Sequence, residues 1–140
     1  MKNLPVPTGL EEYRLNDRVT VRFSPTDLGF LEKLTDSFSK LDALQEEVRA
    51  SRKTITDDRD VFPVARELDG KMRGILNELF GQDVCTPLFG EVSLFASAGG
   101  LPLWANLVLA VAEEVQTAMQ GELAAREERI SKYVEKYGRK

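Results

Sequence analysis

Hydrophobic residues recur at three- and four-residue spacings through much of the chain, which is the pattern of amphipathic helices. The first run predicts a helix that begins with Ser24 or Thr26 as its N-cap and ends near Lys53. Its apolar positions are Leu28, Leu31, Leu34, Phe38, Leu41 and Val48. A second run predicts a helix that Gly81 ends in the left-handed conformation. Its apolar positions are Val61, Val64, Leu68, Met72, Ile75, Leu76 and Leu79.

A third helix is predicted to begin with Pro102 at its first position, where the missing N–H costs nothing. Its apolar positions are Trp104, Leu107, Val108, Val111, Val115, Ala118 and Met119. A weaker pattern resumes after Gly121, so the helix either breaks there or continues to Tyr137 as a projecting, charged end. The two interpretations stay open at this point.

Alternation with a period of two precedes the helices. Val19, Val21 and Phe23 share one face of a predicted strand, while Thr20 and Arg22 share the other. A second β-rich run, residues 13–15, lies before the turn residues Asn16 and Asp17, so a small hairpin is expected. Residues 1–11 show neither period and are expected to form a flexible arm.

Together these patterns predict a mostly α protein of the α+β class. An N-terminal β-hairpin is expected to pack on a bundle of about three helices, the last of them long. The chain divides into a flexible arm (1–11), one globular domain (12–120) and the C-terminal part of the last helix (121–140). A chain of 140 residues is long enough to bury a core of its own.

The distribution of charged residues argues against nucleic acids and membranes as partners. The net charge is −4, and the 19 basic residues are scattered among 23 acidic ones, so no basic stripe for a nucleic-acid backbone is visible. Residues 92–112 carry no charge, but the Gly99-Gly100 pair, Pro102 and Asn106 interrupt this run. The continuous apolar part is only 103–112, which favours a buried core helix over a membrane span.

Few residues could carry chemistry. The chain has no histidine, which removes the commonest general base and the commonest transition-metal ligand. The single cysteine, Cys85, has no neighbouring base and is expected to be a small buried hydrophobe. Asp57, Asp58 and Asp60 lack the rest of a calcium loop and are expected to cap the second helix. We expect no enzyme, no cofactor and no metal site.

One cysteine cannot form an internal disulfide, and the first ten residues contain no basic-then-apolar leader. These features favour an intracellular protein.

The stretch from Phe80 to Trp104 is apolar and nearly uncharged, and it connects the second and third helices. One interpretation is that it closes the end of the helical core. The other is that its aromatic side chains form a partner-binding surface, since exposed aromatic patches usually mark interfaces. Different residues of the stretch can hold each role.

Four segments carry a resemblance to a known family. These are "VTVRFSPTDLGFLEKL", "FGQDVCTPLFG", "GLPLWANLVLAVAEEV" and "RISKYVEKYGRK". They resemble small proteins encoded in the tail-gene modules of siphophages and prophages of Gram-positive bacteria, which are taken to be tail assembly chaperones. The resemblance implies a non-catalytic protein that binds a tail protein, typically the tape measure, in the cytoplasm of the infected or lysogenic host. It also implies self-association, and it supplies no active site to carry over.

Partner contact is expected at two surfaces. The first comprises Leu88, Phe89, Phe95, Leu101 and Trp104, and the second comprises Ile130, Val134 and Tyr137. A small acidic inhibitor of a host defence protein is an alternative, although the interleaving of acids with Lys and Arg argues against charge mimicry. A permanent structural subunit of the tail or neck is a third hypothesis that the sequence does not separate from a chaperone.

Overall fold

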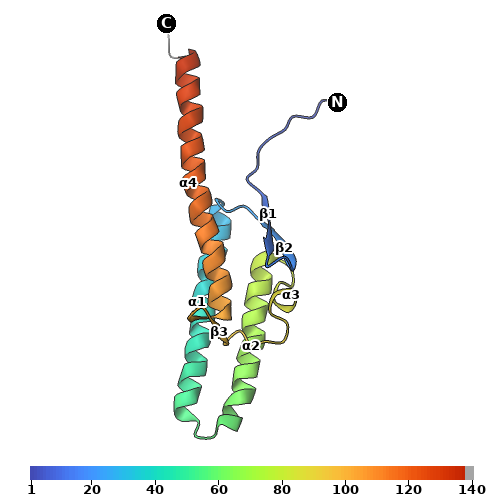
Figure 1. Cartoon of the computed structure of the whole chain (residues 1–140), viewed down its shortest axis with the longest axis vertical. Coiled ribbons are helices and arrows are strands. Elements are labelled where there is room, and N and C mark those ends of the chain that lie inside the picture. The colour runs from blue at the N-terminus through green and yellow to red at the C-terminus, as the bar shows by residue number, and fades with distance from the viewer. Residues whose placement is uncertain (138–140) are drawn as a thin grey trace.

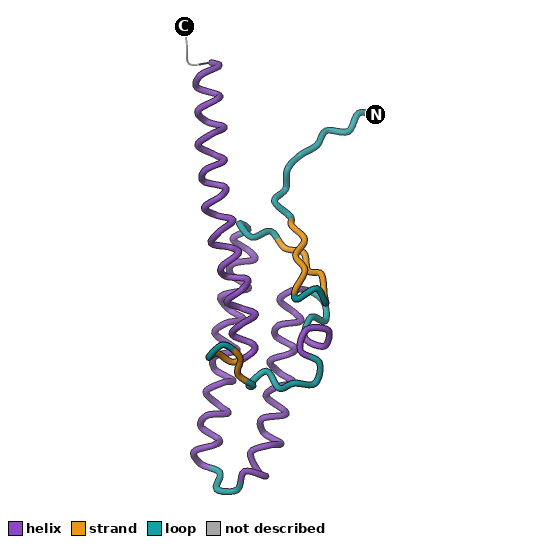
Figure 2. Tube along the Cα trace, in the orientation of Figure 1, coloured by secondary structure: helices purple, strands orange, loops and turns teal. Residues whose placement is uncertain are grey.

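The computed structural model describes residues 1–137 and has the predicted fold class. A two-stranded N-terminal hairpin packs against a helical assembly, and the last helix is long (Figure 1). In chain order the elements are β1 (Glu11–Leu15), β2 (Val19–Phe23), α1 (Leu28–Thr54), α2 (Asp58–Phe80), α3 (Cys85–Phe89), β3 (Ser97–Ala98), β4 (Leu101–Pro102) and α4 (Leu103–Tyr137). Figure 2 shows the same elements as a trace, with the two short strand pairs distinct from the helices.

The β1–β2 hairpin forms as the alternation predicts. The strands are antiparallel with Tyr13 opposite Val21, and Val21 and Phe23 are buried while Arg22 is exposed. Asn16 and Asp17 both have positive φ angles, of 51° and 56°, which Asn and Asp adopt more readily than most residues. The Arg18 N–H donates to the Leu15 carbonyl at 3.0 Å, and three residues separate the paired Leu15 and Val19.

Helices α1 and α2 form an antiparallel pair joined by a short loop (Figure 1). The N-cap of α1 is Asp27, so the prediction of Ser24 or Thr26 was wrong. The Asp27 carboxylate accepts a hydrogen bond from the Gly29 N–H at 3.0 Å, and Ser24 instead closes a turn by accepting from the Asp27 N–H with its backbone carbonyl. A carboxylate satisfies an unpaired helix N–H and also opposes the positive end of the helix dipole.

The residues that cap α2 are those predicted from the sequence. Asp57 is the N-cap and accepts from the Arg59 N–H at 3.0 Å, while Asp58 and Asp60 lie in the first turn. Gly81 ends the helix with φ of 68° and ψ of 21°, the left-handed conformation that was predicted for it.

The core lies where the hairpin, α1, α2 and the first half of α4 meet. Its most buried large side chains are Leu41, Met72, Leu76 and Leu94. Aromatic rings link the hairpin to the helices, because Phe23 stacks with Tyr13 on one side and with Phe30 of α1 on the other, each at 4.5 Å between centroids. Stacked aromatic pairs of this kind stabilise the folded state by more than the burial of their apolar area alone.

Helix α4 begins at Leu103, one residue later than predicted, because Pro102 pairs with Ser97 in the β3–β4 ribbon. The helix then continues without a break through Gly121 to Tyr137, so the projecting form is the one adopted. We call residues 121–137 of α4 the stem. Its described side chains, 122–136, are all exposed, and Figure 1 shows it extending beyond the rest of the molecule.

Residues 1–10 have no regular structure and are exposed throughout. They leave the hairpin as an extended arm on the same side of the molecule as the stem (Figures 1 and 2). Within residues 1–137, no helix combines enough length and hydropathy to span a bilayer.

Candidate interaction surface

The connector between α2 and α4 is held in place by polar side chains of its neighbours. Asp69 of α2 accepts a hydrogen bond from the Leu94 N–H at 2.7 Å and one from Arg73 at 3.0 Å. Arg73 in turn donates to the Val92 carbonyl at 2.6 Å. This half-buried ion pair therefore attaches the connector backbone to α2 at two neighbouring points.

The start of the connector has a similar attachment. The Asn77 side-chain oxygen accepts from the N–H groups of Val84 and Cys85, at 2.9 and 3.1 Å, where the short helix α3 begins. Arg18 of the hairpin turn donates to the Leu88 carbonyl at 3.2 Å. The connector backbone is thus attached to α2 and to the hairpin, and its side chains Val84, Cys85, Leu88 and Leu94 are buried in the core.

The five residues of the first predicted contact surface differ in how far they are buried. Leu88 and Trp104 are buried, with Trp104 only 3% exposed, so neither side chain is accessible to a partner. Phe89 and Phe95 are half-buried against the core. Leu101 is 39% exposed, and of this set it is the one that opens onto a groove. Leu88 and Trp104 therefore belong to the helical core, which is the first of the two interpretations of this stretch.

Cys85 is also part of the core, as predicted. Burial raises the pKa of its thiol to about 11, with only a smaller opposing effect of Arg73. A thiol with so high a pKa is almost entirely protonated at neutral pH and is a poor nucleophile.

An apolar groove lies between α1 and α4, with the β3–β4 ribbon at one end. Its volume is about 370 Å³, and all but one of its lining side chains are apolar. The lining residues are Leu34, Thr35, Phe38, Leu101, Ala105, Val108, Leu109 and Ala112. We call this surface the α1–α4 groove.

Three large side chains on the α1–α4 groove remain open to solvent although the groove is apolar. Phe38 is 47% exposed, Leu109 is 46% exposed, and Leu101 stands beside them. Contiguous exposed apolar surface of this kind is uncommon on soluble proteins without a partner.

The Phe38 side chain, which forms one wall of the groove, is held in place by Trp104. Its ring packs against Trp104, with the ring centroids 5.9 Å apart, and the Trp104 Nε1–H donates to the Gln45 side-chain oxygen at 2.9 Å. The indole therefore links α4 to α1 at two positions, one apolar and one polar. A wall that is already fixed loses little conformational entropy when a partner binds.

Sequence patterns did not identify Phe38 and Leu109 as contact residues. Phe38 was assigned to the core stripe of its helix, and residues 103–112 were expected to form a buried core helix. In the structure Leu109 and Ala110 face solvent. One feature of the sequence could have indicated an exposed apolar face here. An amphipathic helix has one apolar face, whereas residues 103–112 place apolar side chains on every face of the helix. One face can pack on the core, and the apolar residues of the opposite face then remain exposed.

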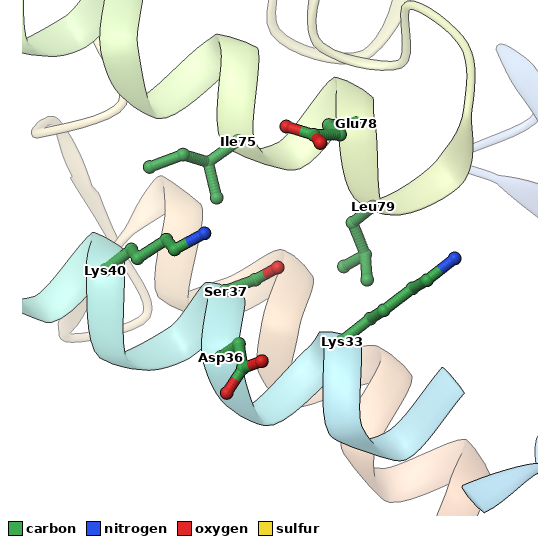
Figure 3. Close-up of a pocket in the computed structure, with 7 residues that line it drawn as sticks. All are labelled: Lys33, Asp36, Ser37, Lys40, Ile75, Glu78 and Leu79. Atoms are coloured by element: carbon green, nitrogen blue, oxygen red, sulfur yellow. The ribbon is translucent and has the colours of Figure 1, made fainter. Parts of the chain in front are cut away.

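A second hollow lies between α1 and α2 and is polar. Figure 3 shows Lys40 reaching toward α2 beside Ile75, while Lys33 extends past Leu79. Asp36, Ser37 and Glu78 complete a lining in which two cations balance two carboxylates, around a volume of about 170 Å³. Such a mixed rim selects neither an anion nor a cation.

The second predicted contact surface lies on the stem. Ile130 and Val134 are both more than half exposed, and Leu123 and Tyr133 are exposed near them. Tyr137 ends α4, and its side chain lies outside the part of the chain that the structure describes.

Comparison with known proteins finds no family model, curated protein or solved structure that matches the chain. Among the described residues, no three Cys, Asp or Glu side chains come close enough to hold a metal ion. The geometry offers an apolar groove between α1 and α4 and a charged stem that exposes a few large apolar side chains, and aromatic and aliphatic residues of this kind are typical of protein interfaces.

Proposed function

We propose that the protein is a non-catalytic binding protein that holds an amphipathic helix of another protein in the α1–α4 groove. The observation that carries this proposal is the supported apolar wall of Phe38, Leu101 and Leu109, which remains exposed in the isolated chain. A groove between two helices receives a third helix by covering a stripe of apolar side chains at i, i+3, i+4 and i+7.

The charges near the groove favour a partner whose apolar stripe is flanked by basic residues. Asp42 lies one helical turn after Phe38, and Glu113 lies one turn after Leu109; both are exposed. Helices α1 and α4 run in opposite directions (Figure 1). Asp42 and Glu113, each one turn beyond a groove residue toward the C-terminus of its helix, are therefore expected toward opposite ends of the groove. Basic residues at the two ends of a bound helix would be attracted to them.

The resemblance to tail assembly chaperones gives this partner an identity. We propose that it is a phage tail protein, with the tape measure as the first candidate, bound in the host cytoplasm before the tail is complete. A long, helix-rich chain with an apolar face aggregates while that face is uncovered, and a soluble acidic protein bound to it prevents this.

The test is co-expression with a tape-measure fragment, followed by measurement of the soluble complex. Leu109→Lys places a charge in the groove, and the proposal predicts that the complex is lost. Ala110→Lys is the matched control, because Ala110 is exposed on the adjacent face of the same turn. This variant is predicted to bind as the wild type does, and circular dichroism verifies that both variants are folded.

Two outcomes contradict the proposal. If Leu109→Lys keeps the soluble complex at wild-type yield, the groove is not the binding surface. If the wild type leaves every tail fragment insoluble, the partner is not a tail protein. A chaperone is further expected to be absent from purified virions, whereas a structural subunit would be present there.

A further inference from the structure

The described side chains of the stem, 122–136, are all exposed to solvent. Most of the stability of helices in proteins comes from packing of an apolar face, and a glycine in a helix interior costs about 1 kcal/mol relative to alanine. The stem has Gly121 at its base and exposes Leu123 and Ile130 along one side. The ion pair of Lys132 with Glu128, at 3.1 Å, is exposed and contributes little.

The apolar residues of the stem continue a heptad pattern that begins in the body of the protein. Positions seven apart along α4 are apolar except for one polar member in each of two series. The first series is Leu109, Gln116, Leu123 and Ile130, and the second is Ala105, Ala112, Met119, Arg126 and Tyr133. A repeat of 3.5 residues sustained along one face is the pattern of helices that pair in a left-handed coiled coil. In the stem the apolar side chains of this face, Leu123, Ile130 and Tyr133, are each more than half exposed to solvent.

The charges of the stem are divided along its length. Residues 121–128 contain three glutamates and one arginine, a net charge of −2. Residues 129–136 contain three basic residues and one glutamate, a net charge of +2. Two stems aligned in parallel would place like charges together, whereas two antiparallel stems place each negative half beside a positive half.

We propose that two copies of this chain pair through their stems in an antiparallel coiled coil. In the register that places the two heptad series opposite each other, Leu123 lies beside Tyr133 of the second copy and Ile130 lies beside the aliphatic part of its Arg126. Glu122 then lies near Lys136 of the second copy, and the symmetric contact occurs at the other end.

The length of the stem fits this arrangement. In the same register, residue 137 of one copy is level with residue 119 of the other, where the stem leaves the body. The two stems, each about 25 Å long at 1.5 Å per residue, therefore overlap along their whole length. Each tip ends beside the other body, and the α1–α4 groove, which ends at Ala112, stays open.

The mass in solution, measured by light scattering over a concentration series, tests the pairing. The wild type is expected to have twice the chain mass of 15.7 kDa. Ile130→Lys removes an apolar contact from both copies and is expected to weaken dimerisation about 100-fold or more. Ala124→Lys adds the same charge on the opposite side of the stem and is expected to leave the dimer within about threefold of the wild type.

Charge exchange tests the orientation. Glu122→Lys and Lys136→Glu are each expected to weaken the dimer, and the double variant is expected to restore it. Cysteine cross-linking gives an independent measurement on a Cys85→Ala background. A mixture of Leu123→Cys and Tyr133→Cys chains is expected to form a mixed disulfide dimer, and Leu123→Cys alone is expected to form none.

A monomer at every concentration overturns the pairing, and so does a dimer that Ile130→Lys leaves intact. Efficient cross-linking of Leu123→Cys to itself overturns the antiparallel orientation. None of these results bears on the α1–α4 groove, so the dimer and the proposed function fail independently.

Discussion

The ring of Phe38 in α1 packs against the ring of Trp104 in α4, with the centroids 5.9 Å apart, and only the Phe38 ring is open to solvent. Trp104 ends the apolar stretch that begins at Phe80 and is the second residue of α4, whereas Phe38 is a wall of the α1–α4 groove. The stretch contributes to the groove in two ways: the buried Trp104 ring packs against Phe38, and Leu101 is exposed in the lining.

Replacing Trp104 therefore has a stability cost that replacing Leu109 lacks. Trp104→Ala is expected to lower the free energy of unfolding by about 3–5 kcal/mol, because it empties a buried site and leaves the Gln45 amide without its donor. Leu109→Ala, at a half-exposed site, is expected to cost less than about 1 kcal/mol. Urea denaturation monitored by circular dichroism measures both. Equal costs for the two variants would contradict the burial of Trp104.

The attachment of the connector to α2 gives a second prediction. Asp69→Ala leaves the Leu94 N–H and the Arg73 Nε–H without their acceptor, so a loss of about 1–3 kcal/mol in the free energy of unfolding is expected, together with faster hydrogen exchange at the Leu94 amide. Glu67→Ala is the control, because Glu67 forms an exposed pair with Lys71 and its loss should cost less than about 1 kcal/mol. Unchanged exchange at Leu94 in Asp69→Ala would show that this hydrogen bond does not hold the connector.

The fold was largely predictable because it follows from local patterns. The alternation of Val21 and Phe23 with Thr20 and Arg22, the position of Gly81, and the capping role of Asp57 all depend on neighbours in sequence. The N-cap of α1 was missed because three residues that can cap a helix, Ser24, Thr26 and Asp27, occur within four positions. The short helix α3 and the β3–β4 ribbon were missed because the connector that contains them is attached partly through residues distant in sequence, such as Asp69, which accepts from the Leu94 N–H.

The contact surface was less predictable for the same reason. Periodicity shows that Leu34, Phe38 and Leu41 lie near one face of α1, but it does not show where α4 stops covering that face. Only the crossing of the two helices buries Leu34 and leaves Phe38 half exposed.

Two glycines, one inside α2 and one at its C-terminal end, are expected to respond to alanine in opposite directions. Gly81→Ala places a Cβ on a residue with φ of 68° and is expected to destabilise the protein by about 1 kcal/mol. Gly74 lies inside the helix, and no neighbouring atom lies within 4 Å of the place that a Cβ would take, so Gly74→Ala is expected to stabilise by about 0.5–1 kcal/mol. Thermal unfolding of the pair decides this, and a destabilised Gly74→Ala variant would contradict the helical geometry.

Tyr13 makes stability depend on pH in the alkaline range. Burial first, and then the nearby Glu114 carboxylate that accepts its hydrogen bond at 3.2 Å, raise the pKa of the Tyr13 hydroxyl from 10.0 to about 12. The folded protein therefore keeps this proton where the unfolded chain loses it, so the stabilisation is complete below pH 10 and declines as the pH rises toward 12.

Urea denaturation of the wild type and Tyr13→Phe at several pH values measures this contribution. The stability of the wild type is expected to fall more steeply than that of Tyr13→Phe between pH 10 and 12. Parallel curves for the two proteins would show that Tyr13 does not titrate differently in the folded state.

The central claim is that a helix binds in the α1–α4 groove rather than on the connector. Methyl NMR during titration with an amphipathic helical fragment of the tape measure tests it most directly. The methyl signals of Leu101 and Leu109 are predicted to shift, while those of buried Leu88 keep their positions. Shifts at Leu88 with none at Leu109 would contradict the claim and place the binding surface on the connector.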